Sequence, residues 1–346
     1  MQKKSILPII KYGKTLDMRS LSRGVEWRRD IAFEQEVLAR LLKGHCDQLY
    51  ACPVCKCTNT TLYVTVFDYP YDKCESCGHI FSATPPQVDA VNNLYNSDSE
   101  LKSIQSKIYL NDDLFLKRVE AIARPKIQFV TDVMIAMHES RNGKWIDIGS
   151  GGGEVLLAAT NVGWETLGIE SDLEECNYAK TKGLKVINEY LSGDAFARLL
   201  QGAQIVSLFN VLEHIPDPKQ FLRNITNVLD NGFVIFEVPR HPSLSSLSSE
   251  LFPNMACRHI YPPDHLHIFS EKSVTILLDE TGLLLVGKWY FGQDFFDLIC
   301  SAGANQGLAT NSVWEEICCI APKVQQVIDE EGLADTMIVV AHKGKI

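Results

Sequence analysis

Residues 145–153 read Trp-Ile-Asp-Ile-Gly-Ser-Gly-Gly-Gly, and this stretch decides the fold class. An apolar run leads straight into the glycines, and a helix-forming segment, 154–160, follows them. Glycine lets the backbone turn sharply and lets a ligand approach without interference from a Cβ atom. The amides at the start of the following helix would then face that ligand. The pattern therefore predicts a strand, a ligand-binding loop and a helix in succession.

The spacing of the glycines indicates which class of ligand the loop binds. Gly149, Gly151 and Gly153 form G-x-G-x-G, whereas dinucleotide-binding folds use G-x-G-x-x-G. Glu154 occupies the third dinucleotide position, where its carboxylate would repel a pyrophosphate. No G-K-S/T sequence follows the glycines, which excludes a P-loop. A cofactor that has no phosphate, but has a cationic sulfonium and an amino-acid tail, suits this loop better.

Acidic residues stand at the ends of the first two predicted strands. Glu170 lies 21 residues after Gly149, where a carboxylate can accept hydrogen bonds from both hydroxyls of a ribose. NAD-dependent enzymes use the same device, so Glu170 alone does not separate the two cofactors. Asp147 lies one residue before the end of the first strand, and it either orients the loop or faces the cofactor's amino group. We also count Asp194 and Asn210 among the expected cofactor contacts.

Apolar runs alternate with helical patterns from residue 126 onward, which is typical of a parallel sheet with crossover helices. Seven runs predict strands, at 144–148, 166–170, 185–188, 205–210, 233–238, 283–289 and 336–341. We therefore predict an α/β fold with one doubly wound, Rossmann-like, mostly parallel seven-stranded sheet. The expected units are an N-terminal helical segment (1–48), a small cysteine-rich ribbon (49–85), a helical connector (86–125) and the α/β domain (126–346). We expect the connector to break at Pro125, and the serines of 243–249 to form a mobile loop.

Polar residues follow the fourth and fifth predicted strands, at the edge where ligands bind to open parallel sheets. Glu213 and His214 come after the fourth strand, and His259, His265 and His267 lie in a segment after the fifth. Imidazole titrates near neutral pH, so His265, His267 and His214 are the candidate catalytic bases. The alternatives are that Glu213 and His214 only cap and orient the next helix, and that the other histidines hydrogen-bond the backbone of a packed loop.

Two close cysteine pairs between residues 52 and 77 form C-x2-C-x18-C-x2-C. This spacing is within the range for structural zinc sites, where four thiolates surround Zn²⁺ as a tetrahedron. We predict that residues 49–85 form a zinc ribbon whose ligands are Cys52, Cys55, Cys74 and Cys77. Cys57 and His79 are competing candidates. A closed site of four thiolates has no position for a substrate, so its expected role is structural.

Together these pieces resemble the class I S-adenosylmethionine (SAM)-dependent methyltransferases, in particular the group that modifies small molecules and sugars. The matching text is IDIGSGGG (146–153), GIE (168–170), VSLFNVLEHIPDP (206–218) and PPDHLHIFS (262–270). A zinc ribbon ahead of such a domain is similar in part to sugar C-methyltransferases, although those enzymes carry a further C-terminal domain. Ubiquinone-type O-methyltransferases also resemble residues 206–218, but they can carry a metal-binding carboxylate where this chain has Asn210. We therefore do not predict a catalytic magnesium.

The resemblance implies methyl transfer from SAM to a hydroxyl or carbon of a small polar acceptor, either sugar-like or a secondary metabolite. The net charge of −10 opposes a nucleic-acid partner, because such binding depends on basic residues. The apolar runs are too short for a membrane span or for the core of a signal peptide, so we expect neither. The expected location is therefore the cytoplasm. The alternatives are a nucleotide-cofactor oxidoreductase, which Glu154 opposes, and a non-catalytic protein that binds SAM or acts through its ribbon. The sequence does not predict the oligomeric state.

Overall fold

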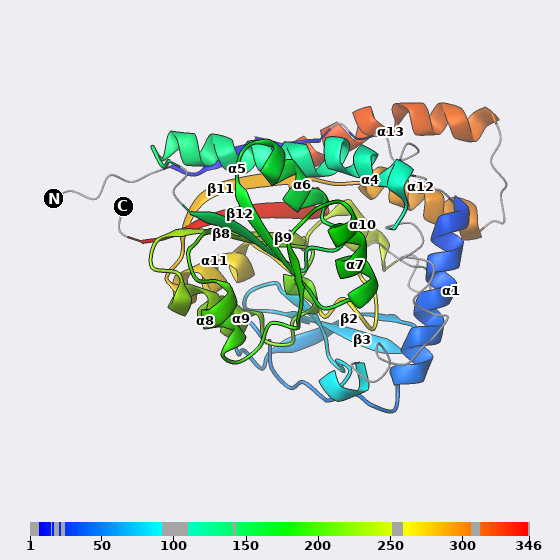
Figure 1. Ribbon diagram of the computed structural model, residues 1–346. Coiled ribbons are helices and arrows are strands. Elements are labelled where there is room, and N and C mark those ends of the chain that lie inside the picture. The colour runs from blue at the N-terminus through cyan, green and yellow to red at the C-terminus, as the bar shows by residue number, and fades with distance from the viewer. Residues whose placement is uncertain are drawn as a thin grey trace.

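The computed structural model describes residues 7–14, 16, 21, 25–91, 110–140, 143–250, 259–305 and 312–344. Its main element is an eight-stranded sheet with helices on both faces (Figure 1). In spatial order the strands are β1 (Ile9–Tyr12), β11 (Leu284–Phe291), β12 (Thr336–Lys343), β9 (Gly232–Pro239), β8 (Ala203–Phe209), β5 (Lys144–Ile148), β6 (Glu165–Glu170) and β7 (Val186–Asn188). β12 runs antiparallel to both of its neighbours, and the other adjacent pairs are parallel. The predicted Rossmann-like, mostly parallel α/β fold is confirmed.

All seven predicted strands are present, and the sheet has an eighth, β1, that was not predicted. β1 pairs in parallel with β11, from Ile9 opposite Gly287 to Tyr12 opposite Tyr290. The N-terminal segment that we expected to be helical thus also completes the edge of the main sheet. The domain boundaries given above stay predictions.

Residues that alternate along the central strands pack on opposite faces of the sheet. Ile146 and Val206 belong to the apolar cluster on one face, and Trp145 and Ile205 belong to the cluster on the other. The helices of the first cluster are α8 (Ala195–Leu199), α9 (Pro218–Val228) and α11 (Glu271–Thr281). Those of the second are α4 (Asp112–Arg118), α5 (Arg124–Ala136) and α6 (Glu154–Asn161). Burial on both faces explains why the strands read as continuous apolar runs.

One long helical run passes through Pro125. α4, the π-helical turn η3 (Val119–Ala123) and α5 follow one another directly, so the predicted break at this proline is wrong. Proline has no N–H to donate, and its ring crowds the preceding turn of an α-helix. The wider π-turn lies immediately before it, where Arg124 donates its N–H to the carbonyl of Val119.

The serine-rich stretch is also ordered, contrary to the expectation of a mobile loop. Residues 244–248 form α10 (Leu244–Ser248), and its three serines are buried. The hydroxyl of Ser243 accepts a hydrogen bond from the Ser246 N–H, and the hydroxyl of Ser246 accepts one from the Ser243 N–H, each at 3.0 Å. This reciprocal capping box depends on the spacing of two serines, and the composition of the stretch does not reveal it.

A second, antiparallel sheet contains the cysteine-rich residues. It consists of β2 (Thr60–Val66), β3 (Tyr69–Cys74), β4 (Ile80–Ser82) and β10 (His267–Ile268). Figure 1 shows β2 and β3 beneath the main sheet, with α1 (Val25–Leu42) beside them. α1 lies within the N-terminal segment, 1–48, that was predicted to be helical. The other helices in the described part of the chain are α7 (Leu173–Thr181), η4 (Leu212–His214), α12 (Asp294–Asn305) and α13 (Ser312–Glu330).

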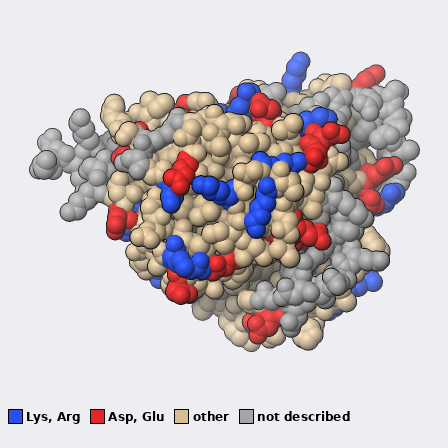
Figure 2. All heavy atoms as spheres, in the orientation of Figure 1, with Lys and Arg blue, Asp and Glu red and all other residues tan. Residues whose placement is uncertain are grey.

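The described residues also bear on the classes of partner. Their helices are not long and apolar enough for any of them to cross a membrane. Figure 2 shows basic and acidic side chains mixed over the described part of one face, without a single broad basic field there. This distribution agrees with the net charge of −10.

Candidate functional site

The glycine loop connects β5 to α6 at the carboxyl edge of the main sheet. Gly149, Gly151 and Gly153 have φ angles of 67°, 53° and 93°, in the left-handed region that favours glycine. A Cβ atom on Gly149 would lie 2.5 Å from Cγ2 of Val211, which follows β8. A Cβ atom on Gly153 would lie 2.4 Å from Cδ1 of Leu184. The loop therefore needs glycine, and it lies directly against the exit of β8.

The carboxylate of Glu170 holds the loop to the end of β6. Its Oε2 accepts a hydrogen bond from the N–H of Gly151, and its Oε1 accepts one from the N–H of Asp172, each at 2.8 Å. Burial raises the pKa of Glu170, and these two backbone bonds oppose that rise. Each carboxylate oxygen has a second lone pair. The group can therefore accept hydrogen bonds from ribose hydroxyls without giving up its bonds to the loop.

Glu175 on α7 is a further acidic residue at the loop, and the sequence reasoning missed it. A Cβ atom on Gly151 would lie 3.4 Å from Oε2 of Glu175. Burial, followed by the charges of Glu170, Asp172 and Glu154, raises the pKa of Glu175 to about 8. Its run of acidic neighbours was a visible signal, but acidic residues are common in the first turn of any helix. The surroundings of the loop favour a cationic ligand.

Two buried networks lie behind the loop. The indole N–H of Trp145 donates to the Ser207 hydroxyl at 2.7 Å, and that hydroxyl donates to Oδ1 of Asp147 at 2.5 Å. Burial raises the pKa of Asp147 to about 7, while the Ser207 hydrogen bond and the nearby Lys126 ammonium oppose the rise. Lys126 is also ion-paired with Glu237 of β9. These contacts hold Asp147 against β8, and its role toward the loop or the cofactor stays a prediction.

The other two expected cofactor contacts, Asn210 and Asp194, are exposed. Asn210 directly follows β8 with a φ of 56°, and its N–H donates to the carbonyl of Glu237 at 3.2 Å. It is exposed at the same edge as the glycine loop. Asp194 is exposed at the residue before α8, where its side chain makes no cap hydrogen bond. A contact of either residue with a cofactor stays a prediction.

Glu213, His214 and His265 come together beside the exit of β8. Their candidate ligand atoms all lie within 4.8 Å of one another, and the two imidazole rings meet edge to face with centroids 4.7 Å apart. Nδ1 of His214 lies 2.9 Å from the carbonyl of Asp264, and Nδ1 of His265 lies 3.0 Å from that of His259. A carbonyl only accepts, so each Nδ1 carries a hydrogen and each neutral ring has its lone pair on Nε2. Such nitrogens can take up a proton or bind a metal ion.

His267 lies apart from this pair, in the contact between the two sheets. Its Nε2 lies 2.9 Å from the carbonyl of Ile215, and its Nδ1 lies 3.2 Å from Nε2 of His79 in the ribbon. Nε2 must therefore donate to the carbonyl, and Nδ1 accepts from His79. Burial lowers the pKa of His267 to about 4. This environment supports the alternative of a packed histidine, and it leaves His214 and His265 as the pair that the structure brings together.

The geometry of the four predicted cysteine ligands fits a zinc ion. The Sγ atoms of Cys52 and Cys77 are 3.7 Å apart, and those of Cys55 and Cys74 are 3.5 Å apart. A tetrahedral zinc with metal–sulfur bonds of about 2.3 Å spaces its sulfurs about 3.8 Å apart. The two competing candidates, Cys57 and His79, are outside this group.

Each cysteine pair lies in a tight turn that ends in the left-handed region. The N–H of Lys56 donates to the carbonyl of Cys52 at 2.9 Å, and the N–H of Gly78 donates to that of Cys74 at 2.8 Å. The φ angles of Lys56 and Gly78 are 60° and 73°. These turns point both thiols of each pair toward one centre, as a closed structural site requires.

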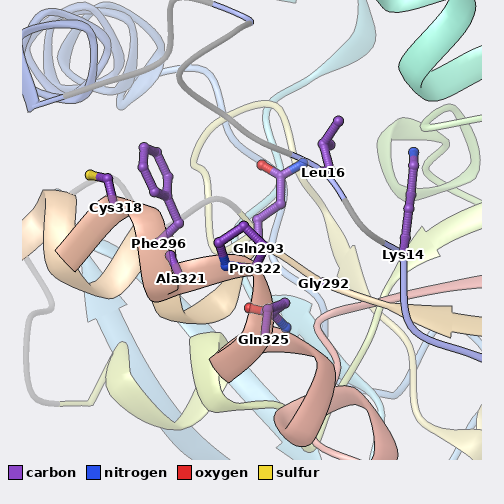
Figure 3. Close-up of a pocket in the computed structure, with 9 residues that line it drawn as sticks. All are labelled: Lys14, Leu16, Gly292, Gln293, Phe296, Cys318, Ala321, Pro322 and Gln325. Atoms are coloured by element: carbon purple, nitrogen blue, oxygen red, sulfur yellow. The ribbon is translucent and has the colours of Figure 1, made fainter. Parts of the chain in front are cut away.

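A cavity away from this edge does not fit a cofactor. It lies between α12, α13 and the chain after β1, as Figure 3 shows, and its volume is about 20 Å³. That volume is little more than the space that one water molecule needs. Its lining includes neither the glycine loop nor the histidine pair.

The raised pKa values of Asp147 and Glu175, about 7 and about 8, predict how stability depends on pH without a ligand. Between about pH 4 and pH 8 these two carboxyl groups bind more protons in the folded chain than in the unfolded chain, so their contribution to the free energy of unfolding falls as the pH rises. Each proton contributes at most about 1.4 kcal/mol per pH unit. Asp147→Asn and Glu175→Gln should each make the change in Tm from pH 5 to pH 8 more favourable than in the wild type, measured by thermal unfolding. The exposed Glu174 provides a control, Glu174→Gln, which should keep the wild-type slope. Equal slopes in all variants would refute the assignment.

The cysteine geometry predicts about one equivalent of zinc in protein that is purified without added metal. Cys52→Ser should bring the metal content close to zero and lower the Tm, because the remaining thiolates no longer close the tetrahedron. Elemental analysis and thermal unfolding measure the two effects, with the exposed Cys319→Ser as control. An unchanged metal content in Cys52→Ser would show that the ligands are misassigned. A second equivalent would indicate an ion at Glu213, His214 and His265.

Comparisons with known proteins identify the family. A family model described as a methyltransferase domain matches residues 115–287, which is half of this 346-residue chain. The ubiquinone biosynthesis O-methyltransferase of Methylococcus capsulatus is 28% identical over 155 residues, which are 42% of this chain and 62% of that protein. The protein of the same name from Colwellia psychrerythraea is 26% identical over 133 residues, 35% of this chain and 54% of that protein. The chain thus matches less than two thirds of the length of each relative.

Solved structures of methyltransferases also align with this chain. Magnesium protoporphyrin IX methyltransferase from Synechocystis, with bound SAH, has a TM-score of 0.47 and 10% identity, and the alignment covers 74% of this chain and all of that one. The plantazolicin methyltransferase BamL has a TM-score of 0.45 and 12% identity, with 72% and 93% covered. The region matched by the family model contains the glycine loop, Glu170 and the whole exit of β8, and its length shows that this chain belongs to the methyltransferase domain family.

Proposed function

We propose that this chain is an enzyme that transfers the methyl group of SAM to a hydroxyl or carbon of a small polar acceptor. One observation carries the proposal, which is the arrangement of the loop and the histidine pair at one edge of the sheet. Glu170 binds the amide of Gly151 at 2.8 Å, and a Cβ atom on Gly149 would meet the side chain of Val211. Val211 directly precedes η4, which ends at His214. A cofactor on the loop would thus lie beside the histidine pair.

The charge around the loop supports SAM as the cofactor. SAM carries a positive sulfonium and a positive ammonium group, and Glu170, Glu175 and Asp147 surround the loop with carboxylates. The argument from Glu154 is weaker than the sequence suggested, because Nε of Arg118 lies 2.6 Å from its Oε1 and offsets its charge. The glycine spacing and the family still oppose a nucleotide-cofactor oxidoreductase.

The histidine pair supports removal of a proton from the acceptor. Methyl transfer is an in-line displacement, and the main task of the enzyme is to align the acceptor with the methyl group. A hydroxyl is a poor nucleophile while it is protonated, and a neutral imidazole within hydrogen-bond reach can take that proton. We favour His265 over His214, because the segment around His265 resembles the wall of the acceptor pocket in related methyltransferases, whereas His214 is held at the end of η4. The names of the two relatives support an oxygen acceptor in preference to carbon.

The class of acceptor and the zinc ion are also proposals. The acceptor is sugar-like or a secondary metabolite, and a small molecule is favoured over nucleic acid by the net charge of −10. A structural Zn²⁺ would be held by the four thiolates of Cys52, Cys55, Cys74 and Cys77. When bound, the ion would cross-link the ends of the ribbon strands. A turnover assay with candidate acceptors separates the enzyme from a protein that only binds SAM.

SAM should bind at the glycine loop. Glu170→Ala should weaken binding by about 1–3 kcal/mol, because it removes a buried charged acceptor of hydrogen bonds. Gly151→Val should abolish binding, because the φ of 53° is strained for a β-branched residue. Isothermal calorimetry measures both effects, and the exposed Glu174→Ala is a matched control on α7. Tight NAD binding without SAM binding would overturn the proposal.

His265→Ala should lower kcat by about 10²–10⁴-fold, because it removes the proposed proton acceptor. The affinity for SAM should hardly change, since this histidine lies outside the glycine loop. Steady-state kinetics and calorimetry on alanine variants of His214, His265 and His267 test this, with the exposed His45→Ala as control. We expect His267→Ala to lower the Tm more than the other two, because His267 is buried, whereas His214 is exposed and His265 is partly exposed. Near-normal turnover in all three variants would mean that no histidine of this segment acts as the base.

A further inference from the structure

We propose that the zinc ribbon is the outer support of the acceptor wall, and that Tyr71 of the ribbon is a positioning residue for His214 and His265. The acceptor wall is defined here as residues 259–268 together with Glu213 and His214. This inference rests on the proposed function, because it assumes that the histidine pair acts on the acceptor.

The ribbon and the acceptor wall share one sheet. β10 belongs in sequence to the α/β domain, between β9 and α11, but it pairs with β4 of the ribbon. His267 lies opposite Phe81, and Ile268 lies opposite Ile80. Without β10 the ribbon would keep three strands, and without β4 the two residues of β10 would lose their only described strand partner. The ribbon is therefore built into the wall.

Tyr71 holds the residue that carries the proposed base. Its hydroxyl donates to the carbonyl of His265 at 2.8 Å, and its side chain is fully buried. The N–H of His265 donates to the carbonyl of Tyr261, also at 2.8 Å. Both backbone groups of His265 are thus engaged, and one of the two bonds comes from the ribbon. A shift of β3 would move the imidazole relative to the cofactor.

A second bridge reaches the other histidine through Leu266. The N–H of Ser82 in β4 donates to the carbonyl of Leu266 at 2.9 Å, and the N–H of Leu266 donates to the carbonyl of Glu213 at 2.8 Å. Glu213 directly precedes His214. Strand β4 is therefore connected by two successive backbone hydrogen bonds to the exit of β8.

Two of the four cysteines lie next to β3 and β4, the ribbon strands that contact the acceptor wall. Cys74 is the last residue of β3, which carries Tyr71, and Cys77 lies shortly before β4, which carries Ser82. The carbonyl of Cys77 accepts a hydrogen bond from the hydroxyl of Ser270, at the start of α11. A metal held by the four thiolates would keep β3 and β4 in register, and with them the acceptor wall. The glycine loop follows β5, and Glu170 ends β6; both strands belong to the main sheet and, among the described strands, neither pairs with the ribbon.

Hydrogen exchange on the full chain tests the role of the metal without relying on activity. We expect chelation to increase exchange by about tenfold or more in peptides from residues 262–270, because their amides lose a fixed neighbour strand. Peptides from residues 146–156 should keep their rates, and the SAM dissociation constant should change less than about twofold. Unchanged exchange at 262–270 after the metal is removed would overturn the proposal. An equal increase in both regions, with loss of SAM binding, would also overturn it, because the ribbon would then support the whole domain.

Tyr71→Phe tests the positioning role, and Tyr63→Phe is its matched control. Tyr63 also belongs to the ribbon and donates its hydroxyl to a backbone carbonyl of the α/β domain, that of Ser246, at 2.9 Å. Each variant loses one oxygen, but only Tyr71 contacts the acceptor wall by this bond. We expect Tyr71→Phe to lower kcat by about ten- to a hundredfold, and to shift the acid limb of the pH profile of kcat, with an unchanged dissociation constant for SAM. Tyr63→Phe should keep the wild-type values.

The two proposals can fail separately. Wild-type kcat in Tyr71→Phe, combined with loss of turnover in His265→Ala, would overturn the positioning role and keep the base. Equal losses in Tyr71→Phe and Tyr63→Phe would show a general effect of the ribbon on stability and would also overturn the positioning role. Wild-type turnover in His265→Ala would instead refute the proposed base, while the exchange experiment would still decide whether the ribbon supports the wall.

Discussion

The peptide groups of Leu266 are the link on which the candidate site depends. Its N–H is bonded to the exit of β8 through Glu213, and its carbonyl is bonded to the ribbon through Ser82. Buried peptide groups need partners, so these three segments can adopt only arrangements in which both bonds form. Since Val211 also lies against Gly149, the same exit of β8 adjoins the cofactor loop. The cofactor side and the acceptor side are therefore two parts of one connected edge.

The buried carboxylates near the glycine loop repel one another, and a bound cation would reduce this repulsion. Glu175 and Asp147 have raised pKa values because each carboxylate is buried near other carboxylates. A ligand that carries positive charge would favour their ionised forms, and it would stabilise the folded chain by binding only that state. The anionic surroundings thus select for the charge of the ligand, while the glycine backbone selects for its shape.

Much of the fold could be predicted because it depends on local patterns. Strands buried on both faces read as apolar runs, and the cysteine spacing alone described a ligand set whose sulfurs lie at zinc distances. Strand β1 could not be predicted, since four residues carry little pattern and their partner, β11, is remote in sequence. His265 and His267 were both expected to be candidate bases. The ribbon separates them, because β10 begins at His267 and pairs with a strand that no local signal connects to it.

The shared strand also has a consequence for how the protein is made. The ribbon is encoded near the N-terminus, but its sheet is complete only when residues 267–268 have been synthesised. Likewise, β1 cannot pair until residues 287–290 of β11 have been synthesised. Pairings between distant parts of a chain form slowly, because the intervening loop must first be closed. A nascent chain would therefore expose an unpaired edge of β4 until residues 267–268 have been synthesised, and the sheet of the ribbon would be completed late in synthesis.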